Sequence, residues 1–225
     1  MKRRAVHPKK LCFFESGGGR RFEAAFHNKS WRKSGQAHFH IIKVSDLREI
    51  EVKILEINKN ELEKKLLSLG AKKVFDDIIE AHFFDFKDKS IKKARSSFRL
   101  RKYGCKAVIT FKKFVPAKNV KARDEFEVEV SHFDTAKRII DCLGLQEWGY
   151  LKKKRTSYSL PGVRFEFDKY LGRLSFVPEF IEIEAKNSKI LYRYAKLLGF
   201  GKKDCKPWNT YQIMDYYKSK HRKNG

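Results

Sequence analysis

The sequence predicts an α+β fold, an eight-stranded antiparallel β-barrel with helices packed outside. Two observations lead to this prediction. About eight segments alternate charged and apolar residues, as "REIEVKI" does at 48–54, and three amphipathic segments between them each end in Leu-Gly. Alternation is typical of a strand with one apolar face, and closing such a sheet into a barrel removes its exposed edges.

The chain divides into three parts by composition. Residues 1–45 carry eleven Lys or Arg against two acids through Lys43 and show no sustained period, which predicts a basic, disordered extension. Residues 46–218 form the patterned domain, and 219–225 are a basic tail. The extension is interpreted either as an unstructured segment or as an arm that binds nucleic acid.

Three helices are expected at 58–70, 132–144 and 187–199. Each begins near an Asn or Asp that can accept a hydrogen bond as an N-cap, and each ends at a glycine suited to a left-handed C-terminal position. The strands are expected at 48–57, 81–88, 96–104, 106–114, 124–132, 149–160, 163–171 and 179–185. Because strictly apolar strands do not alternate with helices, the sheet should be mostly antiparallel.

One face of most of these strands is charged. A single such strand would be interpreted as a solvated face, but seven of them with short Arg-x-Arg and Glu-x-Glu pairs favour a charged barrel interior. Converging arginines and lysines match a polyphosphate, and the carboxylates beside them match a hard cation such as Mg²⁺ or Mn²⁺. The alternating set is Glu49, Glu51, Lys53, Arg99, Arg101, Thr110, Lys112, Glu125, Glu127, Glu129, Lys153, Arg155, Arg164, Glu166, Asp168, Glu182 and Glu184.

Bulk composition limits the classes of function. The formal charge of +25 and a pI near 9.9 indicate a polyanionic partner, which leaves nucleic acid, anionic lipid and phosphorylated small molecules open. Apolar runs fall well short of the ~20 residues that cross a bilayer, so a cytoplasmic protein without a membrane partner is expected. The four cysteines are far apart and form no CxxC pair, which predicts free thiols.

The segment "EIEVK" at 49–53 resembles the ExExK signature of the CYTH superfamily, also called triphosphate tunnel metalloenzymes. The later segments "SSFRLRKYG", "ITFKK", "RDEFEVEV", "KKKRTSY", "FEFDKYLGRLSFVPEFIEIEA" and "TYQIMDYY" follow in the order of that family, so the resemblance spans Arg48 to Tyr217. The spacing of "FEFDKYLGRL" to "FIEIEA" is similar to the class IV adenylate cyclase-like branch.

The resemblance implies an eight-stranded triphosphate tunnel and roles for its lining residues. The implied catalytic residues are Lys53, Arg155 and Asp168. The implied substrate-binding residues are Lys53, Arg99, Arg101, Lys112, Glu127, Lys153 and Arg155. The implied ligands of Mg²⁺ or Mn²⁺ are Glu49, Glu51, Asp168, Glu182 and Glu184. Glu129 is expected to line the tunnel too, and strand parity places Lys153 rather than Lys154 inside.

Three functions follow as hypotheses. The first is conversion of ATP to cyclic AMP and pyrophosphate, as in class IV adenylate cyclases. The second is hydrolysis of inorganic tripolyphosphate or of an organic triphosphate of the thiamine triphosphate type. The third is a non-catalytic protein that binds nucleic acid or polyphosphate. The expected partner is a nucleoside, organic or inorganic triphosphate, while weak nucleic-acid contact through the basic termini and a homodimer stay open.

Recognition of a base would need aromatic walls near the tunnel mouth. Phe83, Phe84, Tyr103 and Phe176 are candidates, although each also suits the core. His82 lies on an expected strand and is interpreted either as an acid–base group or as a structural histidine.

Overall fold

The computed structural model describes residues 11–14, 22–25, 48–104 and 106–223 of the chain, which divides into units 1–41 and 42–225. In the first unit, β1 (Leu11–Phe14) and β2 (Phe22–Ala25) pair antiparallel. The rest of the predicted basic extension and the end of the basic tail lie outside the described residues. Disorder, nucleic-acid contact through the termini and a homodimer therefore stay predictions.

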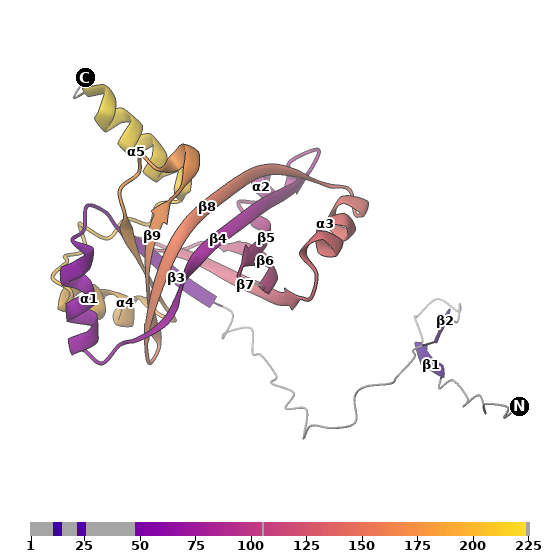
Figure 1. Cartoon of the computed structure of the whole chain (residues 1–225), viewed down its shortest axis with the longest axis horizontal. Helices are drawn as coiled ribbons and strands as arrows, with labels where there is room; N and C mark the ends of the chain where they lie inside the picture. The colour runs from indigo at the N-terminus through magenta and orange to yellow at the C-terminus, as the bar shows by residue number, and fades with distance from the viewer. Residues whose placement is uncertain (1–10, 15–21, 26–47, 105, 224–225) are drawn as a thin grey trace, which may run out of the picture. The chain divides into compact units, whose positions relative to one another are not determined.

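The second unit contains a closed barrel of eight antiparallel strands, as the alternating segments predict (Figure 1). Around the barrel the strands follow the order β10-β3-β7-β6-β5-β4-β8-β9. Their bounds are β3 Arg48–Ile54, β4 Lys72–Phe86, β5 Ser97–Tyr103, β6 Lys106–Val115, β7 Lys121–Val130, β8 Leu145–Leu160, β9 Val163–Tyr170 and β10 Phe180–Ala185. The α+β barrel predicted from the sequence is confirmed.

Three strands are longer than predicted. β4 begins at Lys72 rather than Ala81, because residues 72–78 pair with β8 alone and most of their side chains are exposed, so they lack the alternation of a half-buried strand. β8 starts at Leu145, four residues before the predicted start at Gly149. β7 starts at Lys121 rather than Asp124, and this difference changes the site described below.

Helices cover the outside of the barrel. They are α1 (Lys59–Ser68), α2 (Ser90–Lys93), α3 (Phe133–Cys142), α4 (Ser188–Leu197) and α5 (Thr210–Lys223), with a 3₁₀ turn at Gly172–Leu174. Asn58 and Asn187 cap α1 and α4 as predicted, whereas His132 precedes α3 without a side-chain cap. In the described part of the chain, the apolar content and length of every helix fall short of what a bilayer crossing requires.

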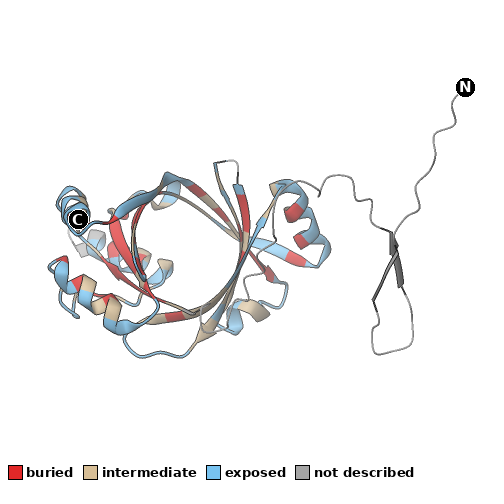
Figure 2. Ribbon diagram, turned by 90° about the horizontal axis from the view of Figure 1, so that it is seen from below, coloured by how far each residue is buried: buried red, intermediate tan, exposed pale blue. Residues whose placement is uncertain are grey.

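Buried apolar residues form three clusters beneath the helices. Figure 2 shows the buried positions on both the barrel strands and the helices around them. The largest packs β3, β9 and β10 against α1 and α4, with Val52, Phe165 and Leu191 fully buried. A second lies under α3, and a third seals α5 through Ile213 and Tyr217. Because the strand faces that meet the helices are apolar, the opposite faces turn into the barrel.

Candidate active site

A cavity of about 960 Å³ runs through the barrel interior and is lined by more basic than acidic side chains. Every residue predicted to be catalytic, substrate-binding or metal-binding lines it: Glu49, Glu51, Lys53, Arg99, Arg101, Lys112, Glu127, Lys153, Arg155, Asp168, Glu182 and Glu184. They come from seven strands, so only the closed barrel brings them together.

The strand register sets opposite charges side by side. Lys53 of β3 faces Glu182 of β10, and its Nζ lies 3.2 Å from a carboxylate oxygen of that residue. Lys112 of β6 faces Glu125 of β7 at 2.5 Å. Cross-strand pairs of this kind compensate charges that would otherwise be costly inside a barrel.

Arg155 occupies the centre of the most densely paired part of the site. Its Nε and Nη2 donate to the two oxygens of Asp168 at 2.6 Å each, and it also forms ion pairs with Glu166 and Glu182. Burial would raise the pKa of Asp168, but Arg155 and Lys153 hold it at about 2. Burial and the neighbouring Arg155 charge lower the pKa of Lys153 to about 8.

Three carboxylates form a cluster suited to a metal ion. Glu51, Glu182 and Glu184 each offer an oxygen, and these oxygens lie within 4.8 Å of one another. Burial, followed by repulsion from neighbouring carboxylates, raises the pKa of Glu184 well above its usual range. Oxygen donors whose charges repel one another fit a hard divalent cation such as Mg²⁺ or Mn²⁺.

The two other predicted metal ligands have different partners. Asp168 is held by Arg155 and Lys153, and Glu49 lies beside Glu125. Burial and the hydrogen bond with Glu125 raise the pKa of Glu49 to about 8. Burial opposes ionisation of Glu125 too, but Lys112 and the hydrogen bond with Glu49 lower its pKa to about 2. At neutral pH, Glu49 therefore holds a proton that it shares with an ionised Glu125.

This shared proton leads to a prediction for the two glutamates. At pH 6.5, Glu49→Gln should change the free energy of unfolding by less than about 1 kcal/mol, because the amide replaces a protonated carboxyl. Glu125→Gln should cost about 1–2 kcal/mol, since Lys112 and Arg99 lose their ionised partner and an ionised Glu49 replaces it only in part. Urea unfolding of both single variants and of the double variant measures the coupling, and equal effects of the two single changes would contradict the shared proton.

Two arginines present donors that the described residues leave unpaired. Arg99 Nε and Arg101 Nε are buried and have no hydrogen-bond partner among the described side chains and backbone groups. Arg101 does form an ion pair with Glu127 through Nη2, and Glu127 also accepts a hydrogen bond from Thr110 Oγ1 at 3.1 Å. Buried unpaired guanidinium donors lining a cavity suit the oxygens of an anionic ligand.

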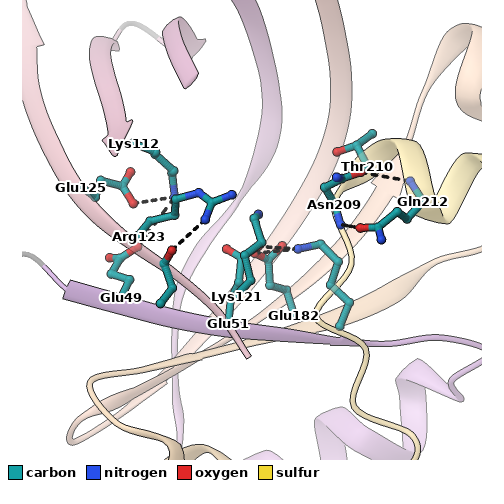
Figure 3. Close-up of polar contacts among 12 residues, drawn as sticks. Glu49, Glu51, Lys112, Lys121, Arg123, Glu125, Glu182, Asn209, Thr210 and Gln212 are labelled. Atoms are coloured by element: carbon teal, nitrogen blue, oxygen red, sulfur yellow. Dashed lines mark hydrogen bonds and ion pairs between the residues drawn. The ribbon is translucent and has the colours of Figure 1, made fainter. Parts of the chain in front are cut away.

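Sequence reasoning missed several basic residues of this cavity, among them Lys121 and Arg123 of β7. Both line it because β7 begins at Lys121, which lies opposite Glu51 of β3 and forms an ion pair with it. Figure 3 shows Lys121 beside Glu51 and Glu182, and Arg123 beside Lys112 and Glu49. The signal was present, since "KARDEFEVEV" continues the same alternation three residues upstream of the predicted strand.

Glu129, Lys154 and His82 all lie outside the cavity lining. Glu129 does not line the cavity, which corrects the prediction: it lies near the end of β7, its side chain is 61% exposed, and it pairs with Lys106. Lys154 is exposed and Lys153 faces inward, as parity predicts. His82 contacts Glu147 at 2.8 Å and packs against Phe133 and Tyr150.

The candidate aromatic residues differ in whether they line the cavity. Phe83 lines the cavity. Phe84 also lines it, although its side chain is fully buried in the cluster under α3, and Phe176 packs with the cluster that seals α5. Tyr103 packs edge-on against Phe75 and is not among the cavity residues.

Known proteins with this pattern share both sequence and fold with the chain. A Methanocaldococcus jannaschii protein whose name marks it as a candidate adenylate cyclase is 25% identical over 142 residues, which covers 63% of this chain and 79% of that protein. The structure of the PH1012 protein from Pyrococcus horikoshii OT3 has a TM-score of 0.61 and 28% identity, over 73% of this chain and 98% of that one. A Vibrio parahaemolyticus structure, described as a candidate adenylate cyclase, has a TM-score of 0.61 and 15% identity, over 74% and 97% of the two chains.

The family comparison covers the barrel strands and the helices between them. The model of the CYTH domain matches residues 47–191, which include every barrel strand and the helices α1 to α3, and the match ends within the first turn of α4. Because this match extends over more than half of the chain, the protein belongs to the CYTH domain family.

Proposed function

We propose that this protein is a metal-dependent enzyme that acts on a triphosphate held inside the barrel. The observation that carries the proposal is that the unpaired donors of Arg99 and Arg101 share one cavity with the cluster of Glu51, Glu182 and Glu184. Guanidinium groups bind phosphate oxygens, and the carboxylates suit the cation that usually accompanies such phosphates.

The proposed role of each side chain follows from its position in the cavity. Arg99, Arg101 and Lys112 bind the phosphate oxygens, and Lys53 and Arg155 hold the carboxylates in place while adding positive charge. A divalent cation bound by the three glutamates would neutralise phosphate charge and act as a Lewis acid. Phosphoryl and nucleotidyl transfer depend mainly on such positioning and charge neutralisation, so no covalent group of the protein is needed.

The reaction we propose is that of a class IV adenylate cyclase. The ribose 3′-hydroxyl of ATP attacks the α-phosphorus, the bond to the β-phosphate oxygen breaks, and cyclic AMP and pyrophosphate form. The name of the M. jannaschii relative supports this choice. Hydrolysis of a triphosphate by water is the second candidate, because the unpaired donors of Arg99 and Arg101 suit phosphate oxygens and place no demand on an organic group.

The test compares Arg101→Ala with Lys102→Ala, whose exposed side chain is the next one on β5. With ATP or tripolyphosphate and Mg²⁺ or Mn²⁺, Arg101→Ala should lower kcat/KM roughly tenfold to a hundredfold, the worth of a lost charge-assisted hydrogen bond. Lys102→Ala should match the wild type. Cyclic AMP formed from ATP identifies a cyclase, and phosphate release without cyclic AMP identifies a hydrolase. Equal rates for the two variants would contradict the proposed site.

A further inference from the structure

Two large aromatic side chains stand half-exposed on the wall of the same cavity. Trp148 of β8 and Tyr211 of α5 are 41% and 49% exposed, and both line the cavity. Their rings are nearly parallel, with an interplanar angle of 16° and centroids 6.5 Å apart. Exposed apolar surface of this kind inside a pocket marks a place where a ligand is bound.

A β-bulge directs Trp148 into the cavity. Phe83 of β4 pairs with Gly149 of β8 and Phe84 pairs with Glu147, so Trp148 is an extra residue that faces no partner. Glu147 points outward, where it contacts His82 and Lys137. Without the extra residue, strict alternation would turn Trp148 outward and Glu147 inward. Bulges commonly redirect a side chain in this way beside active sites.

Tyr211 is held by the start of α5. Asn209 and Gln212 exchange hydrogen bonds, each backbone N–H donating to the other side chain at 2.9 and 3.0 Å, which fixes the first turn of the helix. Thr210 contacts Tyr170 of the barrel at 3.2 Å, and Ile213 is fully buried. In Figure 3, Asn209 and Thr210 lie to the right of the charged side chains of Lys121 and Glu182. The backbone of Tyr211 is therefore held in place by its neighbours, and its ring extends from this ordered helical turn.

Lys92 completes this part of the cavity. Its Nζ lies 5.3 Å from the ring centroid of Trp148 and 5.6 Å from that of Tyr211, so both rings already interact with a polar group. The backbone N–H groups of Ile91 and Lys92 donate to the buried carboxylate of Asp85 at 3.0 and 2.9 Å. The Lys92 backbone is thus anchored, and its side chain is exposed.

We propose that Trp148 and Tyr211 form a stacking subsite for the planar aromatic group of the substrate, so that the preferred substrate is a nucleoside triphosphate rather than inorganic tripolyphosphate. This inference rests on the proposed function, because the triphosphate must lie in the charged part of the cavity. β8 contributes to both the aromatic and the charged parts of the cavity, through Trp148 and Lys153. At roughly 3.3 Å per residue these two residues lie ~16 Å apart along the strand, a distance that an extended nucleoside triphosphate can span. The cavity of about 960 Å³ is also at the upper end for a drug-sized ligand and much larger than a bare triphosphate.

The test measures Kd by isothermal titration in the presence of Mg²⁺ for two probes that do not react. One is ATP in which methylene groups replace the oxygens of both the α,β and the β,γ bridge, and the other is tripolyphosphate with the same two replacements, which lacks the base and ribose. Because stacking of a base on an aromatic side chain is worth about 1–3 kcal/mol, Trp148→Ala and Tyr211→Ala should each weaken binding of the ATP analogue about 5- to 150-fold more than binding of the tripolyphosphate analogue. Trp148→Phe should retain most of the affinity.

Tyr216→Ala is the matched control. Tyr216 lies on α5 and is 36% exposed, but it contacts Trp208 rather than the cavity. Removing the Tyr216 side chain should leave the Kd of both probes unchanged. Equal losses for both probes in Trp148→Ala and Tyr211→Ala, or no loss for either, would overturn the stacking subsite while leaving the triphosphate site in place. A wild-type protein that binds neither probe would overturn the proposed function and this inference with it.

Discussion

Arg155→Ala is expected to abolish turnover and to lower the free energy of unfolding by about 3–5 kcal/mol, the cost of removing one partner from a buried ion pair. Arg155 is buried, with two hydrogen bonds to Asp168 and further ion pairs with Glu166 and Glu182. Without the guanidinium, these carboxylates remain inside the barrel with Lys53 and Lys153 as their nearest cations. Urea unfolding at pH 7, with turnover measured on the same preparations, checks both effects.

Two further variants make this test specific. Arg155→Lys keeps the charge but loses the planar fork that binds both oxygens of Asp168, so its stability should fall between wild type and Arg155→Ala. Lys154→Ala is the control on the same strand, because Lys154 is exposed and lies 4.0 Å from its partner Asp76. A loss of less than about 1 kcal/mol in Arg155→Ala would show that the charged interior is not held together by this residue.

The same ion pair predicts an acid dependence. The pKa of Asp168 is about 2 in the folded chain, below the unfolded value of about 3.9. A carboxyl with a lowered pKa stabilises the fold above the unfolded pKa, and this contribution is lost as the pH falls from about 4 toward 2. The wild type should lose more stability than Arg155→Ala over that interval, because the variant no longer has the ion pair to lose.

Side-chain parity explains why the lining of the site was predictable. In a strand, residues two apart share a face, so Arg99 with Arg101 and Lys153 with Arg155 had to point the same way. The apolar residues between them had to meet helices, and α1, α3 and α4 end near Gly70, Gly144 and Gly199, which adopt the left-handed conformation expected of helix ends. The two-residue alternation of strands and the capping residues of helices depend on neighbouring residues only, so both can be predicted from the sequence alone.

The partners within the cavity depend on distant pairing and could not be predicted in the same way. Lys121 meets Glu51 only because β7 lies beside β3 in the closed barrel. The register sets Glu49 opposite Arg123, and its side chain also meets Glu125, a contact that the sequence did not predict; its role as a metal ligand stays a prediction. Trp148 faces inward because of a single extra residue in β8, and no period-two pattern contains that information.

Glu184→Gln is expected to stabilise the metal-free protein and to weaken its stabilisation by metal. Burial, followed by the charge of Glu166, raises the pKa of Glu184, so at pH 8 this carboxyl opposes folding. A carboxyl with a raised folded pKa costs nothing below its unfolded pKa of about 4.3, and the cost grows as the pH rises above it. At pH 8 the variant should gain about 1–2 kcal/mol, a gain typical of relieving a strained functional site. At pH 5 most of this gain should disappear.

Metal should reverse the order of stability. Mg²⁺ or Mn²⁺ at a hundred times its Kd should stabilise the wild type by about 2.7 kcal/mol, and the variant by much less, since one of its three ligands is gone. Thermal melts with and without metal, at pH 8 and pH 5, measure both effects, and Glu129→Gln on the exposed end of β7 serves as the control. An equal metal shift in Glu184→Gln would exclude Glu184 as a ligand. A variant less stable than wild type without metal would mean that the Glu184 carboxylate supports the fold, so that the glutamate cluster is structural and a cation must bind elsewhere.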